Sequence, residues 1–302
     1  ATTTQLLEVT QGPVALTPQP LHYCDPNNDC FGEFNLEDAS VEIAGGVWPV
    51  PGVSITYHET QTDAETGANP IVSPYYNIDP CTQTIYVRVF YTLTGCANYV
   101  QLQLIVDPTP EATEPADYQL CDYTGAVGYE TFDLSSVEAE ILGSIDPALT
   151  DVTFHTTLAD AQNDANAITS ETSFVNQSIW TQTLYVRVET IATGCYDIVA
   201  LNVVVNPFPN ATEPAYAQYT LCDYNAPIGY EVFDLNSQIA NILLGQSNMT
   251  VTFYPSLAAA QAQVPGTSIN ELYPTLQYTN TAIYVQTLGI VITNDTTGCQ
   301  SI

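Results

Sequence analysis

The chain of 302 residues repeats one long sequence pattern three times. Each repeat opens on a segment containing Cys-Asp, at residues 21–25, 118–123 and 219–224. Phe-Asp-Leu or a close variant follows, then a hydrophobic-Tyr-Val segment, and the pattern closes on Thr-Gly-Cys at Cys96, Cys195 and Cys299. The opening cysteines are 97 and 101 residues apart (121 − 24 and 222 − 121). Units of roughly 100 residues can bury their own cores, so the sequence predicts an array of domains.

The expected domain boundaries fall in two proline-rich segments, residues 107–115 and 206–214. Proline at this density favours extended polyproline II structure, so these segments are expected to be semi-rigid spacers. The predicted domains are repeat 1 at 17–107, repeat 2 at 108–208 and repeat 3 at 209–302, the last without its final strand. Residues 1–16 resemble the last strand of a preceding repeat plus a linker. The sequence is therefore expected to be a window on a longer array.

The charge balance is extreme, with 33 acidic residues, two arginines and no lysine, for a net charge of −31. Such a chain repels phosphate groups and anionic lipids, which excludes nucleic acid as a partner and disfavours membrane surfaces. No apolar run of 18 residues is present, so direct membrane insertion is not expected. Hydrophobic residues make up 45% of the chain, which argues against disorder.

Eight cysteines in a repeated pattern predict disulfides and an oxidising compartment. Because two cysteines recur in every repeat, we expect each repeat to close on itself. The expected pairs are Cys24–Cys96, Cys121–Cys195 and Cys222–Cys299, with Cys30 and Cys81, present only in repeat 1, joined to each other. Cys81 stands at the position of Trp180, so this last bridge is expected to replace an aromatic ring.

Within a repeat the local signals are mostly β. Segments 152–156, 184–188 and 198–205 are rich in β-branched and aromatic residues. Short helices are expected at 136–142 and 236–244, each followed by glycine, and at 158–166, 257–263 and 61–67. The predicted fold class is all-β, with three tandem immunoglobulin-like β-sandwich domains, short helical insertions and a rod-like arrangement.

The succession of Cys-Asp, Phe-Asp-Leu, Thr-Phe-(Tyr/His), hydrophobic-Tyr-Val and Thr-Gly-Cys resembles a known repeat family. It is similar to the repeats of giant surface adhesins that gliding Bacteroidota export by the type IX secretion system. The resemblance covers essentially the whole chain and implies an extracellular adhesin or filament tethered to the outer membrane. It also implies contact with gliding and secretion machinery through parts that this sequence does not contain.

No residue combination predicts catalysis, and the chain is not expected to be an enzyme. His58 and His155 share one strand position with Tyr254, which indicates a packing site. His22 corresponds to Gln119 and Thr220 in the other repeats, which indicates an ordinary residue near the linker. Catalytic sequence motifs are absent, and one close carboxylate pair among 33 acidic residues carries little information.

Calcium is the one cofactor considered, because oxygen-rich loops follow the opening cysteines. The candidate ligands are Asp25, Asn28, Asp29, Asp122, Asp133, Asp223, Asn225 and Asp234. The alternative is that Asp133 and Asp234 cap helices while the loop carboxylates face solvent. EF-hand spacing is absent, so both interpretations stay open.

Arg88 and Arg187 occupy equivalent places, and Gln286 is expected to be their counterpart in repeat 3. Alternation with apolar neighbours predicts that both arginines face outward or toward a sheet edge. A cross-strand ion pair is favoured over ligand recognition.

The predicted function is a structural stalk or adhesive segment used in surface attachment and gliding. Expected partners are neighbouring repeats and a surface polysaccharide or substratum, the latter through exposed tyrosines. Two alternatives remain. One is a filament subunit in which residues 5–9 complete repeat 3 of another copy by strand addition. The other is a carbohydrate-binding or hydrolytic array.

Overall fold

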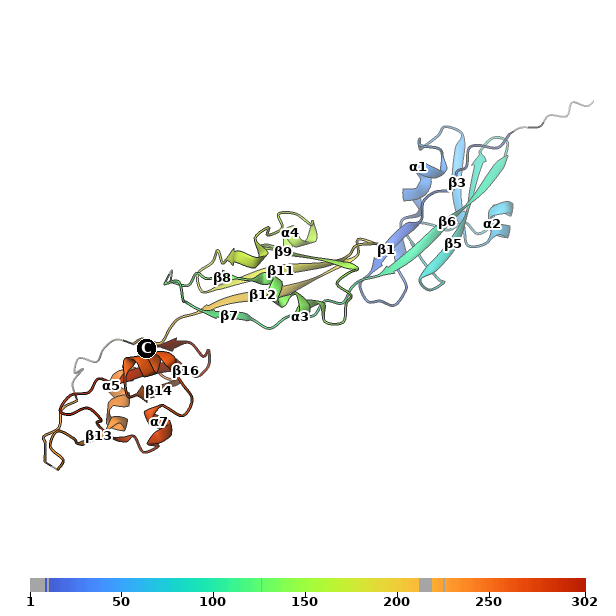
Figure 1. Ribbon diagram of the computed structural model, residues 1–302. Coiled ribbons are helices and arrows are strands. Elements are labelled where there is room, and N and C mark those ends of the chain that lie inside the picture. The colour runs from blue at the N-terminus through green and yellow to red at the C-terminus, as the bar shows by residue number, and fades with distance from the viewer. Residues whose placement is uncertain (1–8, 10, 126, 212–218, 225) are drawn as a thin grey trace, which may run out of the picture. The chain divides into compact units, whose positions relative to one another are not determined.

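The computed structural model describes residues 9, 11–125, 127–211, 219–224 and 226–302 (Figure 1). It is mostly β, with three repeated domains and a few short helices. The described chain forms two compact units, and the division between them runs through repeat 2. One unit contains repeat 1 with the part of repeat 2 that includes Cys195, and the other contains the remainder.

Repeat 1 has a four-stranded sheet in the order β1-β6-β5-β3 and a small sheet of β2 with β4. These strands are β1 (Leu21–Asp25), β2 (Glu33–Phe34), β3 (Val53–His58), β4 (Tyr75–Tyr76), β5 (Thr82–Tyr91) and β6 (Ala97–Pro108). β1 runs parallel to β6, whereas the β6–β5 and β5–β3 pairs are antiparallel. The first and last strands of the repeat therefore lie side by side and point the same way.

The core of repeat 1 lies between the large sheet, the small sheet and one helical segment. Ile85, Val87 and Val89 alternate along β5 onto the buried face, where they pack in one cluster with Phe34 and Leu36. The helical segment, η1 (Leu36–Ala39) and α1 (Ser40–Ile43), covers this face. Helix α2 (Gln61–Thr66) lies on the opposite face of the sheet (Figure 1).

Repeat 2 has the same architecture, with strand order β7-β12-β11-β9 and a small sheet of β8 with β10. Its elements are β7 (Tyr118–Cys121), β8 (Thr131–Phe132), η2 (Leu134–Val137), α3 (Glu138–Leu142), β9 (Thr150–His155), α4 (Leu158–Gln162), η3 (Glu171–Ser173), β10 (Phe174–Val175), β11 (Thr181–Thr190) and β12 (Tyr196–Asn206). Again the first strand, β7, is parallel to the last, β12. The predicted β segments at 152–156, 184–188 and 198–205 lie largely within β9, β11 and β12.

Repeat 3 keeps the plan but has a smaller main sheet, in the order β14-β16-β17. Its elements are β13 (Val232–Asp234), η4 (Leu235–Gln238), α5 (Ile239–Leu243), β14 (Met249–Tyr254), α6 (Leu257–Ala262), α7 (Ile269–Leu272), β15 (Gln277–Thr279), β16 (Gly289–Asn294) and β17 (Gln300–Ser301). β17 pairs with β16 at two residues, whereas β6 pairs with β5 at nine.

The expected equivalence of Ile283-Tyr284-Val285 with the strands of the other repeats is wrong. These residues lie outside β16, and the residue opposite Tyr254 is Gly289. In repeat 2 the residue opposite His155 is Tyr185. The counterpart of Arg88 and Arg187 is therefore Val291, which pairs with Thr252, and not Gln286.

Candidate functional site: disulfides between consecutive repeats

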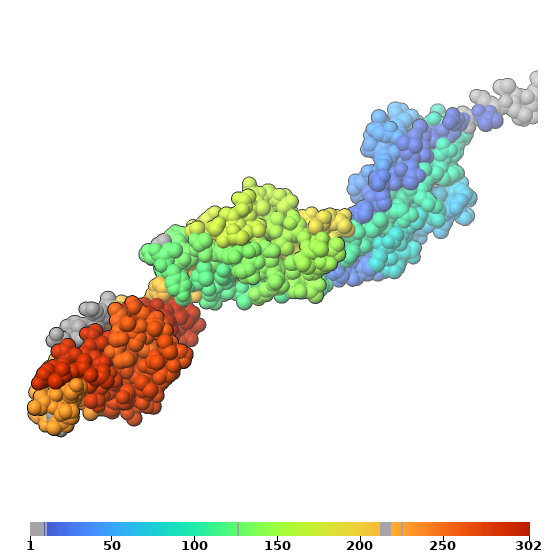
Figure 2. Space-filling model, viewed as in Figure 1, coloured from blue at the N-terminus to red at the C-terminus, as the bar shows by residue number. Residues whose placement is uncertain are grey.

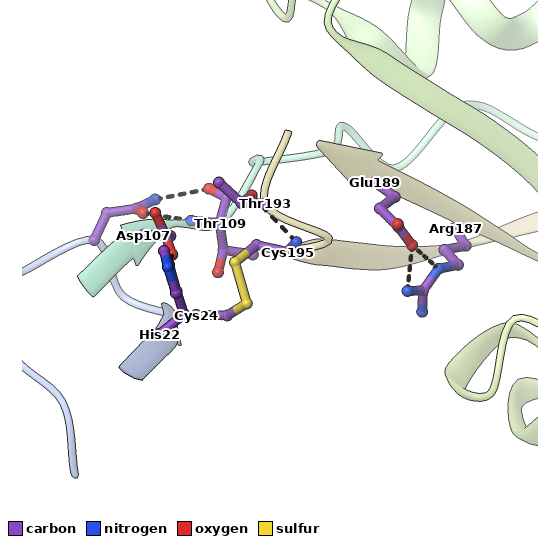
Figure 3. Close-up of a disulfide and its surroundings, with 9 residues drawn as sticks. His22, Cys24, Asp107, Thr109, Arg187, Glu189, Thr193 and Cys195 are labelled. Carbon is purple, nitrogen blue, oxygen red and sulfur yellow. Dashed lines mark hydrogen bonds and ion pairs between the residues drawn. A yellow bond between two sulfur atoms is a disulfide. The ribbon is translucent and has the colours of Figure 1, made fainter. Parts of the chain in front are cut away.

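A disulfide joins the first strand of repeat 1 to the last strand of repeat 2. Cys24 lies on β1, and Cys195 immediately precedes β12 (Figure 3). Their Cα atoms are 5.4 Å apart, and 171 residues separate them in sequence. The bond therefore links two domains and encloses most of both.

The next junction repeats this arrangement. Cys121 at the end of β7 is bonded to Cys299, immediately before β17, with a Cα separation of 5.7 Å and a sequence separation of 178 residues. In both junctions the opening cysteine of one repeat is paired with the closing cysteine of the next. Among the described residues, Cys96 and Cys222 carry no disulfide, and they are the closing cysteine of repeat 1 and the opening cysteine of repeat 3.

The expected pairs Cys24–Cys96, Cys121–Cys195 and Cys222–Cys299 are therefore wrong, and the parallel strands explain why. Cys24 lies opposite Asp107, near the end of β6, whereas Cys96 precedes the start of that strand. Eleven residues of extended chain (107 − 96) span about 36 Å, far beyond the roughly 4.4–6.8 Å that a disulfide allows between Cα atoms. The two cysteines of one repeat stand at opposite ends of its sheet.

Polar side chains connect the two parallel strands beside each bridge. His22 Nδ1 lies 2.6 Å from Asp107 Oδ2 (Figure 3). The equivalent residues in repeat 2 are Gln119 and Asn206, and the Asn206 amide donates to Gln119 at 3.1 Å. These bonds tie the strands at the end where the opening cysteine lies.

The first linker is bonded to both repeats that it joins. Asn28, in the loop after Cys24, donates to the Thr109 carbonyl oxygen and accepts from the Thr109 amide at 3.0 Å. Further along, the Ala112 amide donates to Asp197 and the Thr113 amide donates to the Ile141 carbonyl. Polyproline geometry alone does not position this segment, because hydrogen bonds also hold it at both ends.

The predicted Cys30–Cys81 disulfide is confirmed, as is the correspondence of Cys81 with Trp180. The Cys81 amide donates to the Cys30 carbonyl, just as the Trp180 amide donates to the Gly128 carbonyl. Gly128 has a positive φ of 80°, and an added Cβ would lie 2.9 Å from the Trp180 ring. The indole therefore needs glycine opposite, and repeat 1 fills the same space with a bridge.

Sequence reasoning missed a buried asparagine in each repeat. Asn176 accepts from the Glu130 amide and donates to the carbonyls of Gly128 and Ser178 at 2.7–2.8 Å. Asn77 and Asn280 make the same three bonds in their repeats. The sequence signal is Asn, then Cys, Trp or Tyr four residues later and Gln six residues later: Asn77-Cys81-Gln83, Asn176-Trp180-Gln182 and Asn280-Tyr284-Gln286.

The loop carboxylates proposed for calcium accept hydrogen bonds from the backbone. Asp25, Asp122 and Asp223 accept from the amides of Cys30, Gly128 and Gly229, respectively. Asp29 accepts from the Phe31 amide, and Asn28 binds the linker. These bonds close the loop after each opening cysteine.

The other candidate ligands lie at the starts of helices or outside the described residues. Asp133 accepts from the Ser135 hydroxyl, and Asp234 precedes η4 without a side-chain capping bond. Asn225 lies outside the described residues. Among the described residues, no group of three or more His, Cys, Asp or Glu side chains is placed to hold a metal ion. Asp122 Oδ1 is buried without a hydrogen-bond partner within the described chain, and calcium binding stays a prediction.

His58 and His155 are fully buried and hold a loop in place. Nδ1 of His155 contacts the Ala165 carbonyl at 2.8 Å, and Nε2 contacts the Thr153 hydroxyl at 2.9 Å. His58 makes the same contacts with Ala68 and Thr56. Both ring nitrogens are occupied, which matches the predicted packing role.

Arg187 is buried, contrary to the expectation of an outward-facing arginine. It binds Glu189, two residues along the same strand, and donates to the Ala161 carbonyl at the end of α4. Its guanidinium also lies 3.4 Å from the centroid of the Tyr196 ring. A cation is favourable at a helix C-terminus, so Arg187 fixes α4, which stands out from the surface of repeat 2 (Figure 2). The predicted cross-strand ion pair is wrong.

No helix among the described residues is long and apolar enough to cross a membrane.

Comparison with solved structures finds other multidomain proteins. The chain is 6% identical to Drosophila OTK extracellular domains 3–5, with a TM-score of 0.25 over 94% of this chain and 93% of that one. It is 8% identical to the N-terminal four Ig domains of Dscam1, with a TM-score of 0.22 over 97% and 77%. For Drosophila N-cadherin EC1–3 the identity is 13% and the TM-score 0.19, over 53% of this chain and 57% of that chain. A comparison with curated proteins finds no match.

The repeated pair of sheets, with the first strand parallel to the last in repeats 1 and 2, defines a tandem array of immunoglobulin-like domains with short helices, as the sequence predicted. The three disulfides fit an extracellular protein. A family model described as the Flavobacterium inter-domain disulphide bond domain matches residues 20–110, 117–209 and 218–302. The chain belongs to this family.

Proposed function

We propose that the chain is a stalk segment of a long extracellular adhesin used in surface attachment and gliding. The observation that supports this best is the pairing of each opening cysteine with the closing cysteine of the next repeat. Such bonds have little use in a chain of independent binding domains. They are useful where consecutive domains have to stay attached under load.

The charge of the chain supports the same role. A net charge of −31 keeps neighbouring stalks apart and soluble outside the cell. It also destabilises each compact domain through repulsion between like charges, and covalent bridges offset this destabilisation. The rod-like arrangement and the tether to the outer membrane belong to this proposal, as do the gliding and type IX secretion machinery.

Exposed tyrosines are the proposed contacts with a polysaccharide substratum. Tyr123 and Tyr224 follow the opening Cys-Asp of repeats 2 and 3 and are 73% and 83% exposed. An exposed aromatic ring can stack on a sugar ring. Binding of the chain to a glycan array, lost in Tyr123→Ala plus Tyr224→Ala, would support this contact. Equal binding by the double variant would remove these tyrosines from the proposal.

The adhesin proposal is tested on cells that produce the full-length protein. Antibodies raised against this chain should label intact cells, and antibody-coated beads should move along the surface of gliding cells. A strain carrying Cys24→Ser plus Cys195→Ser, with equal surface labelling, should detach at lower shear flow. Antigen found only inside cells, or unchanged attachment, would contradict the proposal.

A filament subunit joined by strand addition is the second candidate, and one observation favours it. β16 is paired by β17 at only two residues, so much of its outer edge can accept a strand. The segment suggested for this role, residues 5–9, lies outside the described residues except for Val9. A concentration-dependent polymer that disappears when residues 1–12 are deleted would favour this candidate over the stalk.

A further inference from the structure

The two parallel strands of repeat 2 are each continued covalently at both ends. β12 is joined at its start to repeat 1 through Cys195 and at its end to the linker after Asn206. β7 is joined at its start to the preceding linker and at its end to repeat 3 through Cys121. Because β7 and β12 are parallel, both starts lie at one end of the sheet and both ends at the other.

We infer that tension along the array passes through these two strands and bypasses the body of the domain. One covalent path is β1, Cys24–Cys195 and β12. The other is β6, the first linker, β7 and Cys121–Cys299. Residues 122–194, which include β8 to β11 and all the helices of repeat 2, lie on neither path.

The hydrogen bonds of repeat 2 are not needed to resist this load. When tension enters a domain at one strand and leaves at another, the bonds between the strands must resist shearing or unzipping. Here each of the two parallel strands carries tension from its own start to its own end. No force therefore passes from one strand to the other, and the hydrogen bonds between them, from Val203↔Tyr118 to Asn206↔Cys121, are not sheared. The antiparallel pairing of β11 with β9 is likewise outside the load path.

The lengths of the two routes give the size of the effect. Between Cys24 and Cys222 the backbone contains 198 residues (222 − 24), but the route through the bridge contains only 27 (222 − 195). At about 3.4 Å per residue, these routes extend to about 670 Å and about 90 Å. Since eleven of these 27 residues form β12, which is already extended, pulling should lengthen the short route far less than the long one.

This inference rests on the proposed stalk role for the source of the tension, yet its test is independent of that role. Single molecules of the full chain are pulled between an N-terminal tag and the Cys222 thiol, in a Cys96→Ser background that leaves one free thiol. The oxidised chain should lengthen without unfolding steps from repeats 1 and 2. If the mechanical result holds and the cell experiment fails, the load path stands and the adhesin role falls.

Two double variants distinguish the contributions of the two junction disulfides to the load path. Cys24→Ser plus Cys195→Ser should release unfolding steps worth up to 96 residues of contour length, about 330 Å. The shortest covalent route from Cys24 to Cys222 then passes through Cys30–Cys81 and Cys121–Cys299 and contains 123 residues (30 − 24, 121 − 81 and 299 − 222), against 27 in the parent. Cys121→Ser plus Cys299→Ser leaves the short route intact and should behave like the parent.

Adding a reductant to a held parent molecule provides a measurement that does not depend on how a variant folds. All 171 residues should then become available, about 580 Å. Unfolding steps in the oxidised parent at the forces that unfold the first variant would overturn the inference. So would the absence of added length on reduction.

Discussion

The Cys24–Cys195 disulfide should stabilise repeat 1, although one of its cysteines belongs to repeat 2. When repeat 1 unfolds and repeat 2 stays folded, the chain remains held at Cys24 by the bridge and at Tyr118 by β7. The closed loop contains 94 residues (118 − 24), of which Cys30–Cys81 already removes 51, leaving 43. On the chain-entropy model, closing a loop of this size stabilises the folded repeat by about 4 kcal/mol.

Replacing both cysteines with serine should therefore lower the free energy of unfolding of repeat 1 by that amount. For a domain of this size, the change corresponds to a fall in Tm of roughly 15–30 °C. Hydrogen exchange of the β5 amides reports on repeat 1, and exchange of the β16 amides reports on repeat 3. Exchange should accelerate strongly in β5 and stay unchanged in β16.

The matched control is Cys121→Ser plus Cys299→Ser, which removes the other junction disulfide. This variant should leave exchange in β5 unchanged and accelerate it in β16. Equal effects of both variants on β5, or none from either, would refute the reasoning. So would a non-reducing peptide map in which Cys24 is joined to Cys96.

Four other changes test the remaining features. Asn176→Asp removes two donors and buries a charge, so urea denaturation should show repeat 2 destabilised by about 3 kcal/mol or more, while the exposed neighbour change Gln177→Glu should have little effect. Gly289→Ala places a Cβ 2.4 Å from the Ser256 carbonyl oxygen under α6 and should cost repeat 3 about 1–3 kcal/mol in the same assay. The Thr60 hydroxyl and the Asn69 amide hold the pKa of Asp63 below its ordinary value of 3.8, and Thr157 with Asn166 does the same for the pKa of Asp160. Each carboxylate therefore contributes stability above pH 3.8 that is lost as pH falls through its lowered pKa, and Thr60→Ala plus Thr157→Ala should weaken this acid dependence in thermal melts. Calcium bound at the loop carboxylates would raise the melting temperatures, so a clear drop on adding a chelator would support a calcium site, whereas unchanged melting temperatures would leave Asp25, Asp122 and Asp223 as acceptors of backbone amides alone.

The disulfide pairing shows what the sequence can predict and where it stops. Periodicity places one cysteine at the start of each repeat and one near its end, but pairing within a repeat and pairing between repeats satisfy it equally. The deciding information is that the first strand is parallel to the last. The long apolar strand that begins directly after Cys96 and Cys195 was visible in the sequence. Because this strand is extended, a residue that pairs with its far end has to lie more than 30 Å from those cysteines.

The strand register in repeat 3 was mispredicted for a different reason. Ile283-Tyr284-Val285 matches the hydrophobic-Tyr-Val pattern of the other repeats, but it lies outside β16. Tyr284 instead fills the place of Trp180, and its amide donates to Gly229 as that of Trp180 does to Gly128. A buried asparagine with three backbone bonds constrains position more tightly than an aromatic strand residue does. The Asn-to-Gln spacing of six residues was therefore the more reliable guide.

Bonds between repeats make the stability of each domain depend on its neighbours. A bridge inside a repeat constrains the unfolded chain whatever the next repeat does. The Cys24–Cys195 bridge closes a short loop in an unfolded repeat 1 only while repeat 2 is folded, since repeat 2 fixes the distance between Cys195 and β7. Within the described residues, repeat 2 takes part in two such bonds, and repeats 1 and 3 take part in one each. In an array of this kind stability increases with the number of folded neighbours, and a repeat that unfolds stays covalently held between domains that have not.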